Sequence, residues 1–141
     1  MAFFQDGPIH PDLFMADGGL QAELRRRLPE EVRAATWSRF TALGEATAGP
    51  LAKWMTEAEA QLPVHVPYDA WGRRVDEIRT SPAWESLRVF SAEHGLVATG
   101  YEEGLGEHRR IVQAGLLYLY AATSATYSCY LAMTDAAARV L

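Results

Sequence analysis

Residues 111–134 read IVQAGLLYLYAATSATYSCYLAMT, and this stretch decides the fold class because it contains no charged side chain. Its length is close to that of a membrane span, but Gln113, Thr123, Ser124 and several tyrosines make it too polar for one. Its alanines and Gly115 allow neighbouring helices to approach closely. We therefore expect a helix buried in a protein core, and no association with a membrane.

Helix start and stop signals divide the rest of the sequence into further helices. Asp17 and Ser81 are suited to the N-cap position, and Gly95 is suited to end a helix. The predicted helices cover residues 17–28, 29–48, 51–61, 81–94 and a long segment from about 107 onward. A last helix is expected to begin near Thr134-Asp135, where a hydroxyl cap precedes an acidic first turn.

The segment 62–80 interrupts this helical pattern. Its prolines exclude a long helix, and apolar side chains alternate with others before the turn-forming residues 69–72. The predicted fold class is therefore all-α: a single helical-bundle domain over residues 1–141, with a short hairpin-like excursion around 64–78. At the N-terminus, Phe3 and Phe4 are expected to form an extended arm whose rings pack on the domain.

The charge of the chain excludes one class of partner. The formal net charge is −5, whereas a nucleic-acid-binding surface needs clustered positive charge. The one short basic run, Arg25–Arg27, is flanked by glutamates and is predicted to be the solvated end of a helix, where cations complement the helix dipole. We expect no nucleic-acid partner.

Side chains suited to catalysis or metal binding are few. The single cysteine, Cys129, lies in an apolar run and is expected to be a buried structural thiol. The histidines at positions 10, 65, 94 and 108 lack metal-ligand or catalytic spacing. Glu102 and Glu103 lie in a glycine-rich stretch and are expected to be solvated carboxylates. We therefore predict no catalytic residue and no metal site.

The cellular compartment follows from two further features. A lone cysteine is typical of a reducing compartment, and the N-terminus lacks the positive region and long apolar stretch of a signal peptide. We expect a cytoplasmic protein.

Four stretches are distinctive in combination. They are FFQDGP (3–8), PYDAWGRRVDEIRTSPAW (67–84), HGLVATGYEE (94–103) and ATSATYSCYLAMTDAAARVL (122–141). In this order and at this spacing, they resemble the N-terminal region of the acyl-CoA dehydrogenase family, particularly its adaptive-response subgroup, which includes the bacterial alkylation-response flavoprotein. The resemblance extends over nearly the whole chain and implies the helical N-terminal domain of that family.

The family resemblance implies a flavoenzyme with three parts: this helical domain, a small β-domain and a C-terminal helical domain. FAD and the carboxylate base would belong to the other two parts, so this chain alone would be neither catalytic nor flavin-binding. Its role would be to wall the acyl pocket and to form interfaces. The implied partners are the remaining domains, in the same chain or a separate one, an acyl-CoA-like substrate, and further subunits of a homo- or hetero-oligomer.

The same resemblance places the acyl-pocket wall near the carboxyl end of the chain. The wall residues carried over are Tyr127, Tyr130, Met133, Thr134, Ala136 and Ala137. The family motif resembles S-C-P-L-A-M-T-D-G-A-A-R, and residues 128–139 here read SCYLAMTDAAAR. Tyr130 thus replaces a proline and Ala136 a glycine, and both changes would narrow an acyl or flavin-facing cavity. No cofactor-binding residue is assigned.

Two features leave several functions open. The last helix ends in apolar Val140-Leu141 without a cap, which predicts that it packs on something outside this polypeptide. That element would be a following domain, or a separate subunit of a split enzyme. The departures at Tyr130 and Ala136 instead favour the alternative function, a non-enzymatic, stand-alone helical binding or assembly module derived from this domain.

Overall fold

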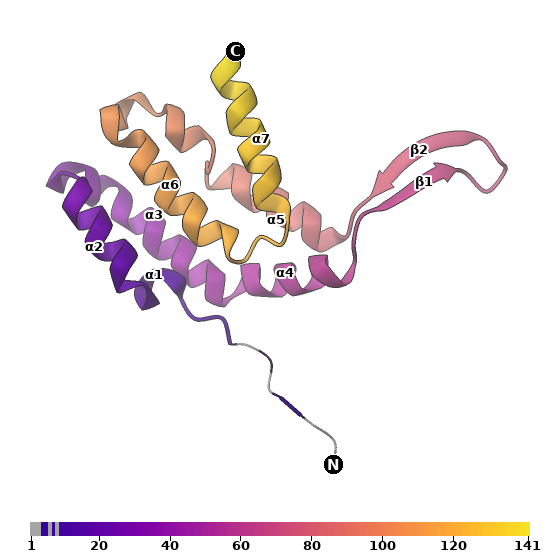
Figure 1. Cartoon of the computed structure of the whole chain (residues 1–141), viewed down its shortest axis with the longest axis horizontal. Coiled ribbons are helices and arrows are strands. Elements are labelled where there is room, and N and C mark those ends of the chain that lie inside the picture. Colours follow the sequence, from indigo (N-terminus) through magenta and orange to yellow (C-terminus); the bar gives the residue numbers. More distant parts are fainter. Residues whose placement is uncertain (1–3, 6, 8) are drawn as a thin grey trace.

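The computed structural model describes residues 4, 5, 7 and 9–141 and shows a helical bundle from which a β-hairpin projects (Figure 1). Its α-helices are α1 (Leu13–Ala16), α2 (Gly18–Arg27), α3 (Glu30–Ala48), α4 (Pro50–Ala60), α5 (Pro82–Glu93), α6 (Arg109–Ala121) and α7 (Tyr127–Val140). Two 3-10 helices, η1 (Ala98–Tyr101) and η2 (Glu103–His108), link α5 to α6. The predicted helical bundle with a hairpin is confirmed.

The predicted helix ends at α2 and α5 are confirmed. Asp17 caps α2 and Ser81 caps α5, each accepting a hydrogen bond from the backbone N–H three residues later. Gly95 follows α5 with a positive φ of 58°, and the N–H of Leu96 donates to the carbonyl of Ser91 at 3.1 Å. This arrangement satisfies a terminal carbonyl of α5 and turns the chain toward η1.

The hairpin consists of β1 (Val64–Tyr68) and β2 (Arg74–Arg79), which pair antiparallel with a register shift between Val66 and Tyr68. It projects away from the helices in Figure 1. All residues of β2 are exposed, and Trp71 in the connecting turn is 90% exposed.

The core is centred on α6. Leu116 and Tyr120 of α6 are buried together with Phe40 of α3 and Leu87 of α5. Gly115 permits this contact, because a Cβ at that position would lie 2.8 Å from the ring of Phe40. The Tyr120 hydroxyl donates to the Leu87 carbonyl at 2.9 Å, and burial raises the pKa of Tyr120. The hydroxyl thus satisfies its hydrogen-bonding capacity inside the core.

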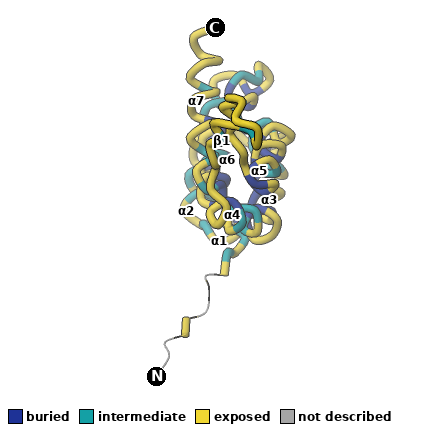
Figure 2. The backbone as a smooth tube through the Cα atoms, turned by 90° about the vertical axis from the view of Figure 1, so that its right-hand side faces the viewer, coloured by how far each residue is buried: buried dark blue, intermediate teal, exposed yellow. Residues whose placement is uncertain are grey.

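The structure corrects the prediction for residues 111–134. This stretch forms two helices, because α6 ends at Ala121 and a turn containing Ala125, with a positive φ of 48°, precedes α7. The predicted start of the last helix near Thr134-Asp135 is wrong, since α7 begins at Tyr127. Figure 2 shows the buried core below the largely exposed outer turns of α7. Most core residues of the stretch lie in α6, whereas α7 buries only Leu131.

Two smaller expectations are also corrected. Cys129 is exposed, because it lies on a side of α7 that faces away from the bundle. The Phe4 ring is 89% exposed and does not pack on the domain, while Phe3 lies outside the described residues. Glu103 is exposed, as expected, and Glu102, whose side chain is 41% exposed, forms an ion pair with Arg39 at an Nη1–Oε1 distance of 3.0 Å.

Two surface properties are relevant to binding partners. Arg25–Arg27 form the exposed last turn of α2, as predicted. Among the residues that the structure describes, no helix is both long enough and apolar enough to cross a bilayer.

Candidate functional site

A groove of about 470 Å³ lies between α5, η1 and α7, within the volume range of small-molecule sites. Its lining residues are Arg88, Ser91, Ala92, Gly95, Val97, Ala98, Tyr101, Tyr127, Leu131, Thr134 and Ala138. The lining positions of α7 recur every three or four residues and therefore form one face of the helix. Most of the lining side chains are small or apolar, so the groove suits a narrow apolar ligand.

The two ends of the groove differ in chemistry. At the start of α7, Tyr127 and Arg88 both line the groove, and Tyr127 packs edge-on against Trp84 with ring centroids 5.6 Å apart. The Tyr127 hydroxyl, like an ordinary phenol, is neutral at neutral pH and can donate a hydrogen bond, and burial raises its pKa further. Ala138 lines the groove three helical turns further along α7, and Tyr101 lies near this end because its hydroxyl donates to the Asp135 carbonyl.

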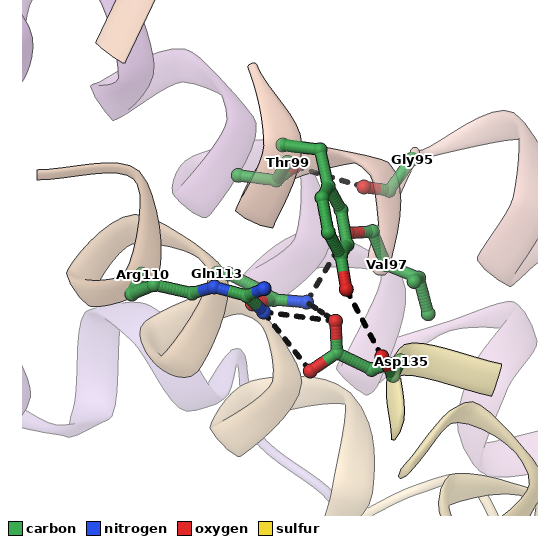
Figure 3. A network of polar contacts seen from close by, with 7 residues as sticks. Gly95, Val97, Thr99, Arg110, Gln113 and Asp135 are labelled. Atoms are coloured by element: carbon green, nitrogen blue, oxygen red, sulfur yellow. Dashed lines mark hydrogen bonds and ion pairs between the residues drawn. The ribbon is translucent and has the colours of Figure 1, made fainter. Parts of the chain in front are cut away.

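A polar network fastens α7 to α6 and to the loop before η1 (Figure 3). Nη1 of Arg110 donates to both carboxylate oxygens of Asp135, at 2.8 and 2.9 Å. Nε2 of Gln113 lies 3.3 Å from the same carboxylate and donates to the carbonyl of Val97 at 3.1 Å. These contacts hold α7 at a defined position beside the groove.

Tyr101 connects this network to the groove. Its hydroxyl donates to the backbone carbonyl of Asp135 at 3.0 Å, and the guanidinium of Arg110 lies 4.5 Å from its ring centroid. Burial acts to raise the pKa of Asp135, but hydrogen bonds from Arg110, Gln113 and Tyr101 outweigh it and lower this pKa. Asp135 is therefore an ionised carboxylate at neutral pH.

The residues predicted to form the acyl-pocket wall all lie on α7, but the structure does not bring them to one surface. Tyr127 and Thr134 line the groove. Ala136 instead lines a separate cavity with Asp135 and Arg139, on another side of the helix.

The other three predicted wall residues form part of an exposed apolar face of α7. Tyr130 and Met133 are 46% and 55% exposed, and Ala137 is exposed as well. Val140 and Leu141 extend this face to the end of the chain. The ring of Tyr130 nevertheless contacts its own domain by stacking on Tyr127 and packing edge-on against Trp84.

Sequence reasoning missed several residues that build the groove. Leu131 shares the helical spacing of Tyr127 and Thr134, so periodicity along α7 would have identified it once the helix start was known. Arg88 and Tyr101 lie on other elements, and no spacing in the sequence relates them to α7. The role of Asp135 was missed because its partners belong to α6 and η1.

The residues that line the groove do not form a cofactor site by themselves. Binding of a dinucleotide requires cations or a glycine-rich turn at a helix N-terminus for the pyrophosphate. Arg88 is the only cation among the described residues that line the groove, and it already pairs with Glu85. These residues therefore do not fit FAD. In the described part of the chain, no cluster of three or more His, Cys, Asp or Glu side chains could hold a metal.

Comparisons of sequence link the chain to known proteins. The family model described as adaptive response protein AidB N-terminal domain matches residues 9–141. Acyl-CoA dehydrogenase family member 11 of Caenorhabditis elegans is 32% identical over 140 residues, which are 99% of this chain and 23% of that protein. The putative acyl-CoA dehydrogenase AidB of Escherichia coli strain K12 is 30% identical over 146 residues, covering 99% of this chain and 25% of that protein.

Solved structures show the same relationship. Bd2924 in its apo form has a TM-score of 0.92 and 46% identity, covering 98% of this chain and 27% of that one. C. elegans ACDH-11 in complex with C11-CoA has a TM-score of 0.88 and 32% identity, covering 94% of this chain and 23% of that one. The chain thus spans about a quarter of the length of the curated relatives it matches.

Proposed function

Because the chain belongs to the adaptive response protein AidB N-terminal domain family, we propose that it is the acyl-pocket and interface-forming domain or subunit of an acyl-CoA dehydrogenase-type protein. The predicted resemblance to the N-terminal region of acyl-CoA dehydrogenases is confirmed over the whole chain. The observation that carries the proposal is the groove between α5, η1 and α7, whose shape and lining suit an acyl chain.

An acyl-CoA-like compound is the proposed ligand of this groove. A solved structure that resembles this chain holds C11-CoA, and the groove combines an apolar lining with Arg88 and Tyr127 at one end. The neutral phenol of Tyr127 and the guanidinium of Arg88, which keeps its ion pair with Glu85, would donate hydrogen bonds to the thioester carbonyl of such a ligand. The small side chains along the rest of the groove suit its hydrocarbon part.

The exposed apolar face of α7 is the proposed interface with the remaining domains. Met133 and Val140 are 55% and 88% exposed, and such a contiguous apolar surface is typical of a contact with another domain or subunit. The partner would be a β-domain and C-terminal domain in the same polypeptide or a separate one. Tyr130 and Ala137 lie on this face and would contact the partner.

The chemistry of the complete protein would reside outside this chain. This chain would orient the acyl group and exclude water from it. No residue of this chain is assigned a catalytic role. The single cysteine supports a cytoplasmic location.

A domain-replacement experiment tests this function. This chain would replace the matching N-terminal quarter of C. elegans ACDH-11, and the hybrid would be assayed for flavin absorbance and C11-CoA binding. The hybrid should be yellow and bind C11-CoA, whereas this chain alone should be colourless and inactive. Met133→Asp should disrupt the hybrid, while Ala114→Asp, at an exposed position of α6, should not. A yellow isolated chain, or a folded hybrid without affinity for C11-CoA, would contradict the proposal.

One observation favours the alternative of a stand-alone helical binding or assembly module. Tyr130 covers part of its own domain by packing on Trp84 and Tyr127, and so reduces the surface left for another domain. Sedimentation of this chain with and without acyl-CoA separates the two functions. A stable homo-oligomer with no affinity for acyl-CoA would favour the alternative.

A further inference from the structure

We infer that Tyr101 closes one end of the groove and thereby sets the length of the acyl chain that the groove accepts. This inference rests on the function proposed above and adds a specificity-determining residue to it.

The position of Tyr101 is held by two different elements. Its hydroxyl donates to the Asp135 carbonyl of α7 at 3.0 Å, and its ring lies against the guanidinium of Arg110 of α6, 4.5 Å away. Arg110 is itself bonded to the Asp135 carboxylate. The ring is thus fixed at both its polar tip and its face, so it forms a rigid wall rather than a side chain that swings aside for a longer ligand.

The groove has a defined orientation relative to this wall. Its polar end is marked by Arg88 and Tyr127, and its opposite end by Tyr101 and Ala138. The two marker positions on α7, Tyr127 and Ala138, are about 16 Å apart at a rise of 1.5 Å per residue. A ligand with its thioester group at Arg88 and Tyr127 therefore extends its chain toward Tyr101.

Tyr101 is the largest side chain at this apolar end. The neighbouring lining residues are Val97, Ala98, Thr134 and Ala138. Their small side chains leave the groove wide enough for a linear hydrocarbon. The aromatic ring of Tyr101 limits how far this hydrocarbon can extend along the groove. Removing the ring should lengthen the groove without altering its polar end.

The test measures chain-length preference in the full chain. Affinities for octanoyl-, dodecanoyl- and hexadecanoyl-CoA would be determined by calorimetry. Tyr101→Ala should shift the preference toward the longer chain, by about tenfold in relative affinity. Tyr101→Phe retains the ring and should keep the wild-type order. Ala138→Leu fills the same end from α7 and should shift the preference toward the shorter chain, while Ala114→Leu on the exposed face of α6 should not.

The outcomes separate this inference from the proposed function. Binding of acyl-CoA with the same chain-length order in wild type, Tyr101→Ala and Ala138→Leu would overturn the role of Tyr101 alone. Absence of binding to every acyl-CoA would overturn the groove as an acyl site, and the role of Tyr101 with it. If Tyr101→Ala does not fold, the chain-length preference of Ala138→Leu decides whether this end of the groove limits the length of the acyl chain.

Discussion

One guanidinium nitrogen of Arg110 lies 2.8 and 2.9 Å from the two carboxylate oxygens of Asp135, and this contact joins α6 to α7. α7 buries only Leu131, whereas α3, α5 and α6 each bury five or six residues, so packing alone holds α7 weakly compared with these three helices. The ion pair compensates by tying the middle of α7 to the central helix of the core. The position of the groove wall formed by α7 therefore depends on a polar contact.

Substitution of Asp135 by alanine is expected to lower the free energy of unfolding by about 2 kcal/mol, because hydrogen bonds to charged groups contribute about 1.5–3 kcal/mol. It would also leave Arg110 without its anionic partner. Urea unfolding followed by circular dichroism measures the change. Glu103→Ala removes the same charge from an exposed position and is the matched control. Equal effects of the two substitutions would show that the ion pair does not support α7.

The stability contributed by Asp135 should depend on pH. Its pKa is lowered in the folded state, so the ionised carboxylate favours folding. This contribution is fully present above the unfolded-state pKa of about 3.9 and is lost as the pH falls through the lower folded-state pKa. The stability gap between wild type and Asp135→Asn should be constant between about pH 7 and 5 and shrink below about pH 4. A gap that widens in acid would contradict this assignment.

A side chain at Gly100 is predicted to displace the side chains of Gln113 and Arg110. A Cβ there would lie 2.3 Å from Oε1 of Gln113 and 2.7 Å from Nη1 of Arg110, inside the network that holds α7. Gly100→Ala should therefore destabilise the fold by about 1–3 kcal/mol, as other overpacking substitutions do. Gly104→Ala is the control, because no atom lies within 4 Å of a Cβ at that position. The melting temperatures of the two variants are compared by thermal unfolding. Equal melting temperatures would refute the predicted clash.

Two tryptophans provide a test of which surface belongs to the core. Trp84 is 9% exposed and packs edge-on against Tyr127 and Tyr130 at centroid distances of 5.6 and 5.5 Å. Trp84→Ala should cost about 3–5 kcal/mol. Trp71 in the hairpin turn is 90% exposed, and its replacement by alanine should change stability by less than about 0.5 kcal/mol. Chemical denaturation of both variants measures the difference between their losses of stability. Equal losses would show that the hairpin turn packs on the bundle.

Local chemistry accounts for what was predictable in the fold. The caps at Asp17 and Ser81, and the helix end at Gly95, depend on side chains and backbone preferences within a few residues. The hairpin was predictable for the same reason, because prolines, alternation and turn residues act within one short segment. The break between α6 and α7 was not, since the turn at Ala125 contains no glycine or proline to mark it.

The candidate site, in contrast, depends on contacts between segments that are far apart in the sequence. The family resemblance pointed to residues of α7 for the pocket wall, and two of them, Tyr127 and Thr134, line the groove. The opposite wall, the closure at Tyr101 and the bonding of Asp135 come from helices distant in the chain. Residue types in the sequence were enough to set helix boundaries and turns, because those depend on interactions between neighbours. The groove and its polar anchor required the folded arrangement, because packing of α5, α6 and α7 brings together side chains that no spacing in the chain relates.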